Sequence, residues 1–121
     1  IINKRLVVGF HNGWTVINTH LSFVPLFNLV QLKKVKRWAL HLAHSTGTKV
    51  VIVGDLNLPK NLPVALSSWK SLVTKNTYPS WGGKIQFDYL LVPGSQDTFA
   101  TPLSYPPTGI SDHLPIGVEI Q

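Results

Sequence analysis

The beginning of the chain has the pattern of two short strands joined by a tight turn. Residues 5–10 are rich in β-branched and apolar side chains, which favours a strand. His11-Asn12-Gly13 follows, and Asn-Gly is the strongest short signal for a hairpin turn. Residues 14–19 then alternate between apolar and polar, as expected of the returning strand. We therefore predict an antiparallel strand pair that ends beside His20.

After Pro25 the hydrophobic period changes to three or four residues. Apolar side chains recur at this spacing at Leu29, Leu32, Val35, Ala39 and Leu42. Such spacing predicts an amphipathic helix, and Gly47 is a suitable residue to end it. The polar face of this helix carries four basic residues, namely Lys33, Lys34, Lys36 and Arg37. We interpret this cluster as a solvated helix face rather than a phosphate-binding patch.

The rest of the chain predicts mostly strands and loops. Residues 49–53 are a continuous apolar run, typical of a strand that is covered on both faces. From there we predict, in order, a loop at 59–63, a short helix at 64–72, a strand at 84–92 with Asp88 in its middle, strand and loop at 97–105, and a last strand at 116–120. With no repeat or linker composition, the chain is predicted to be one unit of mixed α and β structure.

Composition narrows the class of protein. The chain has 121 residues, of which 44% are hydrophobic and 13% charged, and this is typical of a globular protein. It has no Cys, which excludes disulfides and thiolate metal sites, and no Met. Because a translated chain normally begins with Met, we expect a fragment. No apolar run is long enough to cross a membrane, so we expect a soluble protein, with the cytoplasm favoured.

The charge is strongly basic, and the few acids are the more informative residues. The net charge is +6, which suits a polyanionic partner such as nucleic acid, although solubility alone would also explain it. The five acids are Asp55, Asp88, Asp97, Asp112 and Glu119. Where so few carboxylates exist, those placed within or beside apolar strands require a chemical reason.

Four polar clusters lie at the ends or in the middle of apolar segments. They are Thr19-His20-Leu21, Gly54-Asp55-Leu56-Asn57, Phe87-Asp88-Tyr89 and Ser111-Asp112-His113. If residues 55–57 are extended, Asp55 and Asn57 point to one side and suit a hard cation, or a water and a phosphate oxygen. The alternative for this pair is an Asx-turn with no further role.

The other clusters also have structural alternatives. Asp88 either has a buried partner or faces solvent on the polar side of its strand. An Asp-His pair such as Asp112-His113 can bind a metal through the carboxylate and move a proton through the imidazole. His20 taken alone is more typical of a surface or hydrogen-bonded histidine than of a catalytic one.

Taken together and in this order, the four clusters resemble the C-terminal half of the endonuclease/exonuclease/phosphatase (DNase I-like) family. The resemblance extends from about Arg5 to Ile120, so residues 1–121 are expected to be the C-terminal half of a single domain. It implies an α/β (α+β) fold, a four-layered β-sandwich with helices outside. It also implies hydrolysis of phosphodiester bonds with Mg²⁺, or Mn²⁺ as the alternative cation.

The resemblance also implies a role for each residue. His20, Asn57 and His113 would contact the phosphate, Asp55 would position or deprotonate the attacking water, and Asp88 would orient His113. Asp55, Asn57 and Asp112 would be the metal ligands. The Asn and Glu that the family carries on earlier strands have no counterpart here. We therefore expect residues 1–121 alone to be inactive, to need the missing N-terminal half as a partner, and otherwise to associate or aggregate.

Substrate choice stays open at this point. A nuclease acting on DNA or RNA is the first hypothesis, because the charge is basic. A phosphoesterase acting on a lipid headgroup or an inositol phosphate shares the same motifs. A non-catalytic scaffold module on the same fold is the third hypothesis, although the five polar side chains carried over from the family for chemistry, together with Asp112, are intact. The loop aromatics Trp81 and Tyr105 suit a nucleobase or a membrane, but ordinary loop packing is the simpler interpretation.

Overall fold

The computed structural model describes residues 6–65 and 67–121, and it is mostly sheet with one helix. Its elements are β1 (Leu6–His11), β2 (Trp14–Thr19), α1 (Phe27–Thr46), β3 (Lys49–Asp55), β4 (Trp69–Ser71), β5 (Asp88–Pro93), β6 (Ala100–Pro102) and β7 (Val118–Ile120). The mixed α and β character predicted from the sequence is therefore confirmed. Across the described residues, no helix is both long and apolar enough to span a membrane.

Five strands form the main sheet, in the order β1-β2-β3-β5-β4. β2 and β3 are parallel and are joined through α1, whereas the other neighbouring strands are antiparallel. β6 and β7 form a separate two-stranded sheet. This topology brings the end of β2, the end of β3 and the beginning of β5 to one edge of the molecule.

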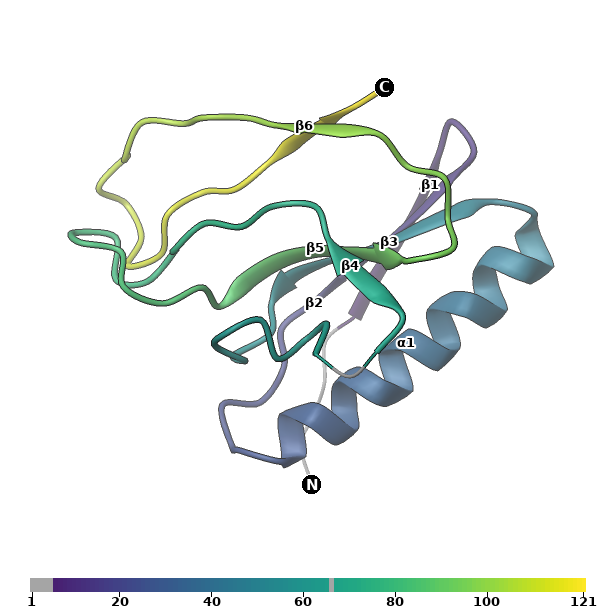
Figure 1. The fold of residues 1–121 in the computed structure, drawn as a ribbon, viewed down its shortest axis with the longest axis horizontal. Helices are drawn as coiled ribbons and strands as arrows, with labels where there is room; N and C mark the ends of the chain where they lie inside the picture. Colours follow the sequence, from purple (N-terminus) through teal and green to yellow (C-terminus); the bar gives the residue numbers. More distant parts are fainter. Residues whose placement is uncertain (1–5, 66) are drawn as a thin grey trace.

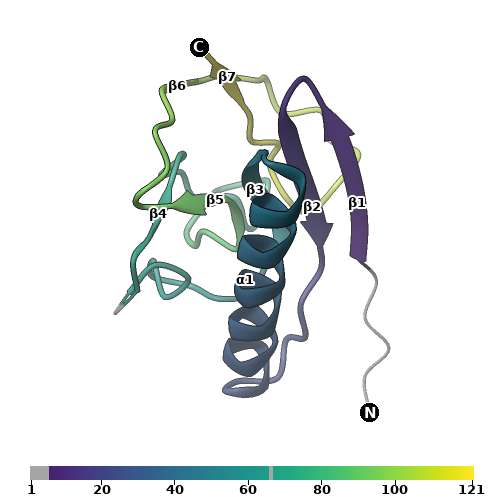
Figure 2. The ribbon, with the colours of Figure 1, turned by 90° about the vertical axis from the view of Figure 1, so that its right-hand side faces the viewer.

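The main sheet lies between α1 and the segment that carries β6 and β7 (Figure 1). Turned by 90°, the molecule shows α1 running in front of β2 and β3 (Figure 2). The core between helix and sheet is formed by fully or nearly fully buried side chains, chiefly Ile17, Leu32, Ala39, Val50, Ile52, Tyr89 and Leu91. Burial of these side chains supplies most of the stabilisation of the layered arrangement.

The structure confirms the hairpin and the helix that the sequence predicts. Asn12 and Gly13 both have positive φ, 48° and 77°, as a tight hairpin turn between twisted strands requires. The helix ends at Gly47, which is left-handed with φ 65° and donates its N–H to the carbonyl of Ala43. Arg5, the first residue of the predicted strand, lies outside the described residues.

The predicted helix at 64–72 is wrong. The described part of this segment forms turns that lead into β4, in which Trp69 pairs with Pro93 of β5 and is only 8% exposed. Burying the large indole against the core and adding an edge strand outweigh the weak helical preference of so short a segment.

The predicted strand at 84–92 begins later than expected, so Asp88 is the first residue of β5 and not its middle. Before Asp88, the buried side chain of Gln86 donates hydrogen bonds to the carbonyls of Val73 and Asp88. These side-chain bonds take the place of the backbone hydrogen bonds of a regular strand. The expectation that Asp88 lies inside a strand is therefore wrong, and this side chain lies at the edge where β3 ends.

Gly54 allows β2 and β3 to meet closely just before Asp55. Its φ is 135°, and a Cβ placed there would lie 2.0 Å from the carbonyl oxygen of Thr19. Both the backbone conformation and the contact exclude a side chain. The glycine of the Gly-Asp-Leu-Asn motif is therefore explained by backbone packing next to the polar cluster.

We predict that Gly54→Ala lowers the free energy of unfolding by about 3 kcal/mol, because either the strand ends must separate or the residue must change conformation. Gly82→Ala is the matched control, since a Cβ there meets nothing within 4 Å, and it should change stability by less than about 0.5 kcal/mol. Urea unfolding of both variants measures the difference. Equal stability of the two would show that the strand ends are not in this close contact.

Candidate functional site

Two carboxylates lie directly opposite each other at the edge of the main sheet. Asp55 is the last residue of β3, Asp88 is the first residue of β5, and the two are cross-strand partners. Directly opposed residues of an antiparallel pair have side chains on the same face, where like charges destabilise the sheet. Both side chains are largely buried, 18% and 17% exposed, so water compensates this repulsion poorly. A cationic or hydrogen-bonding partner is required.

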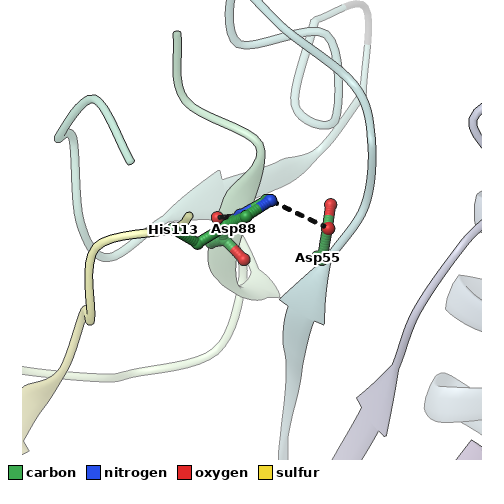
Figure 3. Close-up of side chains that lie close together, drawn as sticks. All are labelled: Asp55, Asp88 and His113. Atoms are coloured by element: carbon green, nitrogen blue, oxygen red, sulfur yellow. Dashed lines mark hydrogen bonds and ion pairs between the residues drawn. The ribbon is translucent and has the colours of Figure 1, made fainter. Parts of the chain in front are cut away.

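His113 is that partner (Figure 3). Its Nδ1 lies 2.7 Å from Oδ2 of Asp88, and its Nε2 lies 3.7 Å from Oδ2 of Asp55. Because a carboxylate can only accept, we assign the proton to Nδ1, which donates to Asp88. This hydrogen bond fixes the ring so that Nε2 faces Asp55. Of the two alternatives left open for Asp88, the structure therefore shows the buried partner, and that partner is His113.

The environment raises the pKa values of both Asp55 and His113. Burial, and then the charge of Asp88, raise the pKa of the Asp55 carboxyl, and the N–H of Asn57 and the two histidines offset this only in part. Burial lowers the pKa of His113, but its hydrogen bond to Asp88 and the charges of Asp88, Asp55 and Asp112 outweigh this and raise it. The cluster therefore favours a protonated imidazole beside a carboxylate with increased proton affinity.

His20 and Asp112 border the same cluster from its exposed side. Nε2 of His20 lies 3.4 Å from Oδ2 of Asp55, and Oδ1 of Asp112 lies 4.0 Å from Nε2 of His113. Their side chains are 70% and 61% exposed, whereas that of His113 is 24% exposed. The cluster thus has a buried layer, Asp88 and His113, and an accessible layer, His20 and Asp112. Asp55 lies between the two layers.

Asn57 differs from its expected geometry. Its φ is 53°, so residues 55–57 are not extended as assumed from the sequence. Its N–H donates to Oδ1 of Asp55 at 3.0 Å, which is the Asx-turn considered above as the alternative. Its side-chain Nδ2 donates to the carbonyl of Leu21 at 2.8 Å. Asn57 therefore fixes one oxygen of Asp55 and joins this loop to the one that follows His20.

Two buried polar residues of α1 support these loops and were missed in the sequence. Asn28 donates from Nδ2 to the carbonyl of Asn57, and the side chain of Gln31 accepts the N–H of Ser22. Both residues share the buried helix face with Leu32, Val35 and Ala39. The sequence did contain a signal for them, because both are polar residues at positions where the helical period predicts the core, and buried polar groups need hydrogen-bond partners.

Aromatic side chains enclose His113, which the sequence analysis also missed. The ring centroid of Tyr78 lies 5.1 Å and that of Phe87 6.5 Å from the centroid of the imidazole. Tyr78 and Phe87 also contact each other at 5.6 Å. These rings restrict the imidazole and limit the access of water to its buried side. Phe87 stands in the Phe87-Asp88-Tyr89 cluster, but the local sequence carries no signal for its proximity to His113 or for that of Tyr78.

The donor set fits a divalent cation. One ligand atom each from Asp55, Asp88 and His113 lie within 4.8 Å of one another. The charge of Asp88 is, after burial, the second cause that raises the pKa of Asp55, and a cation between the two carboxylates would relieve that repulsion. Oδ2 of Asp88 is bonded to His113, whereas Oδ2 of Asp55 lies 3.4 Å from the exposed His20. Asp55 and the exposed Asp112 are therefore carboxylates that a hard cation could reach from solvent.

Comparison with solved structures identifies the fold. No protein-family model and no curated protein sequence matches the chain. Truncated TDP2 from Caenorhabditis elegans is 22% identical, with a TM-score of 0.59 over 91% of this chain and 56% of that chain. A mannosyl-6-phosphatase from Bacteroides thetaiotaomicron is 15% identical, with a TM-score of 0.65 over 89% of this chain and 51% of that chain. These likenesses support a DNase I-like fold, and the chain spans about half the length of the structures it matches.

We predict that Asp55→Asn stabilises the metal-free protein at pH 8 by about 1 kcal/mol, because it removes one of two opposed charges and keeps the oxygen that accepts the Asn57 N–H. The folded-state pKa of Asp55 is raised, so the wild type is relatively most stable below the ordinary carboxyl pKa and loses stability as the pH rises through the folded value. The gain should therefore vanish towards pH 3–4.

Thermal unfolding in EDTA across this pH range measures the effect. The exposed Asp97→Asn is the control and should show no comparable gain at pH 8. A lower melting temperature for Asp55→Asn than for the wild type at pH 8 would contradict the repulsion between Asp55 and Asp88.

Proposed function

We propose that this chain carries the catalytic cluster of a metal-dependent phosphoester hydrolase, and that phosphodiesters are its preferred substrates. The observation that carries the proposal is His113, held by Asp88 at 2.7 Å and facing Asp55 with its other nitrogen. A general base, an oriented imidazole and a potential cation site beside one another are the parts such hydrolysis needs. The likeness to a sugar phosphatase agrees with phosphoester chemistry.

The geometry supports the roles that the family resemblance implies for these residues. Asp55, with its raised pKa, would accept a proton from the attacking water. His113, whose pKa is raised, against the effect of burial, chiefly by its hydrogen bond to Asp88, would in its protonated form donate from Nε2 to the phosphoryl oxygens, where negative charge develops in the transition state. Asp88 would keep the imidazole oriented and charged. His20, on the exposed side, would contact the phosphate or assist the leaving group.

Asp55 and Asp112 would bind the cation, which we propose to be Mg²⁺, with Mn²⁺ as the alternative. When bound, it would neutralise charge on the phosphoester oxygens. We propose that Asn57 holds the carboxylate of Asp55 through its backbone N–H and the loop after His20 through its side chain. It would also contact the phosphate and the metal, as the family resemblance implies. Carboxylate donors alone suit either cation, because both prefer oxygen ligands.

We further propose that residues 1–121 form the C-terminal half of one four-layered domain. The chain covers 56% and 51% of the two structures it resembles, which supports this proposal. The remaining metal ligands would then come from the N-terminal half of the same domain. Assays of activity therefore require the full-length polypeptide.

Nucleic acid is the proposed substrate, because the chain has a net charge of +6. We predict that the full-length protein nicks supercoiled plasmid in Mg²⁺, and that the Asp55→Ala, His113→Ala double variant loses this activity by at least about a hundredfold. EDTA should abolish nicking, and the exposed Asp97→Ala should leave it unchanged.

Two other outcomes are informative. If the protein hydrolyses a lipid or a small phosphodiester but does not nick plasmid, the proposed site is supported and nucleic acid is wrong as its substrate. Inactivity on every phosphodiester, with no Mg²⁺ binding, would contradict the proposal and favour a scaffold. A lipid phosphoester is the second candidate because exposed apolar side chains, foremost Phe23, follow His20 closely.

A further inference from the structure

The loop between β2 and α1 presents an unusually apolar surface to solvent. Phe23 is 82% exposed, Val24 44% and Leu26 74%, and we refer to these three residues as the apolar tip. Leu26 also has a positive φ of 67°, a conformation that costs free energy for a residue with a large side chain. In both views the loop lies at the end of the molecule opposite β6 (Figures 1 and 2).

The apolar surface continues along the outer side of α1. Leu29, Val30 and Leu40 are 38%, 51% and 47% exposed. Val30 lies opposite the buried face of the helix, which consists of Asn28, Gln31, Leu32, Val35 and Ala39, and Leu29 and Leu40 lie on the flank between the two. The apolar tip and this helix face together form a larger apolar area than single exposed side chains would give.

The same outer face is basic and contains no acid. Lys33, Lys34 and Arg37 are exposed, and we refer to them as the basic stripe. Lys36 is different, because its Nζ donates to the carbonyl of Pro63 and lies over the ring of Trp69. Asp55 is the first acid in the sequence, so none of the preceding 54 residues opposes the stripe.

The apolar tip and the basic stripe, taken together, favour a membrane surface over nucleic acid as the partner of this face. A solvated helix face explains the basic stripe but not the exposed apolar tip. Single-stranded nucleic acid requires basic groups with aromatic stacking surfaces, whereas most of the exposed apolar residues here are aliphatic. Aliphatic and aromatic side chains beside lysines and arginines suit the boundary between lipid headgroups and acyl chains. Negative lipids would then attract the basic stripe.

We propose that the apolar tip and the outer face of α1 bind the surface of a membrane that contains anionic phospholipid. The tip enters the headgroup region, and the basic stripe contacts the phosphate and carboxylate groups of the lipids. Binding holds the protein at the bilayer surface without crossing it. This inference does not rest on the proposed chemistry.

The surface is linked to the polar cluster through the backbone. Leu21 follows His20, donates its N–H to the carbonyl of Asp55 at 3.0 Å and accepts a hydrogen bond from Asn57. The apolar tip begins two residues later. Membrane binding through the tip therefore brings the accessible side of the cluster close to the lipid surface.

Sedimentation with vesicles tests the proposal on the full-length protein. We expect binding to vesicles of phosphatidylcholine and phosphatidylserine, weak binding to phosphatidylcholine alone, and weaker binding as salt is raised. The Phe23→Ser, Leu26→Ser variant should bind at least about tenfold more weakly. The Lys33→Gln, Lys34→Gln, Arg37→Gln variant should lose the preference for phosphatidylserine, by about fivefold for each charge removed.

Matched controls remove similar groups elsewhere. Phe99→Ser, Ile110→Ser removes side chains that are 68% and 88% exposed, and Lys60→Gln, Lys70→Gln, Lys84→Gln removes three exposed charges. Both should bind vesicles like the wild type, as should the Asp55→Ala, His113→Ala variant. Retained binding by this last variant separates membrane docking from catalysis.

Three results would overturn the proposal. The first is no binding to phosphatidylserine vesicles by the folded full-length protein. The second is equal loss of binding in the control variants, which would indicate non-specific adhesion. The third is binding of a single-stranded oligonucleotide that depends on the basic stripe, without vesicle binding, which would make nucleic acid the partner of this face. Circular dichroism of each variant confirms that it is folded.

Discussion

The repulsion between two opposed carboxylates is the constraint on which the rest of the site depends. Asp55 and Asp88 are cross-strand partners with little access to water, and the strand register leaves them on one face. The imidazole of His113 compensates this repulsion by bonding one carboxylate and facing the other. A cation bound at Asp55 would compensate it further. Charge that is unfavourable to folding is thus concentrated where phosphoester chemistry would use it.

The surrounding structure keeps these charges in place. Gly54 lets the ends of β2 and β3 approach, so the loop after His20 reaches Asp55. Asn57 joins that loop to β3, and Asn28 of α1 holds the carbonyl of Asn57. The parallel pair β2 and β3, connected by the helix, thus positions residues that lie 35 positions apart in the sequence, His20 and Asp55. The same connection places the exposed apolar tip next to the cluster.

Much of this could be predicted from sequence, and the failures have physical causes. The hairpin and the helix followed from the turn residues Asn12-Gly13 and from the apolar period ending at Gly47, because local conformation determines both. The helix predicted at 64–72 failed, because burial of Trp69 against the core is a tertiary effect. The pairing of Asp88 with His113 was expected only from the family resemblance, since the two are 25 residues apart. The left-handed conformation of Asn57 depends on packing between loops, which no local pattern reveals. Asn28 and Gln31 stood out as polar residues at core positions of the helix, but their partners in the loops could not be predicted.

Paramagnetic broadening by Mn²⁺ in an NMR spectrum of the assigned protein tests the central claim most directly. If Asp55 and Asp112 hold the cation beside His113, low Mn²⁺ should first broaden the amide signals of residues 54–57 and 112–113, together with that of His20. Mg²⁺ should reverse the broadening by competition, and Asp55→Asn should weaken it. Broadening centred elsewhere, or broadening unaffected by Asp55→Asn, would contradict the proposal that this cluster is a metal-dependent reaction centre.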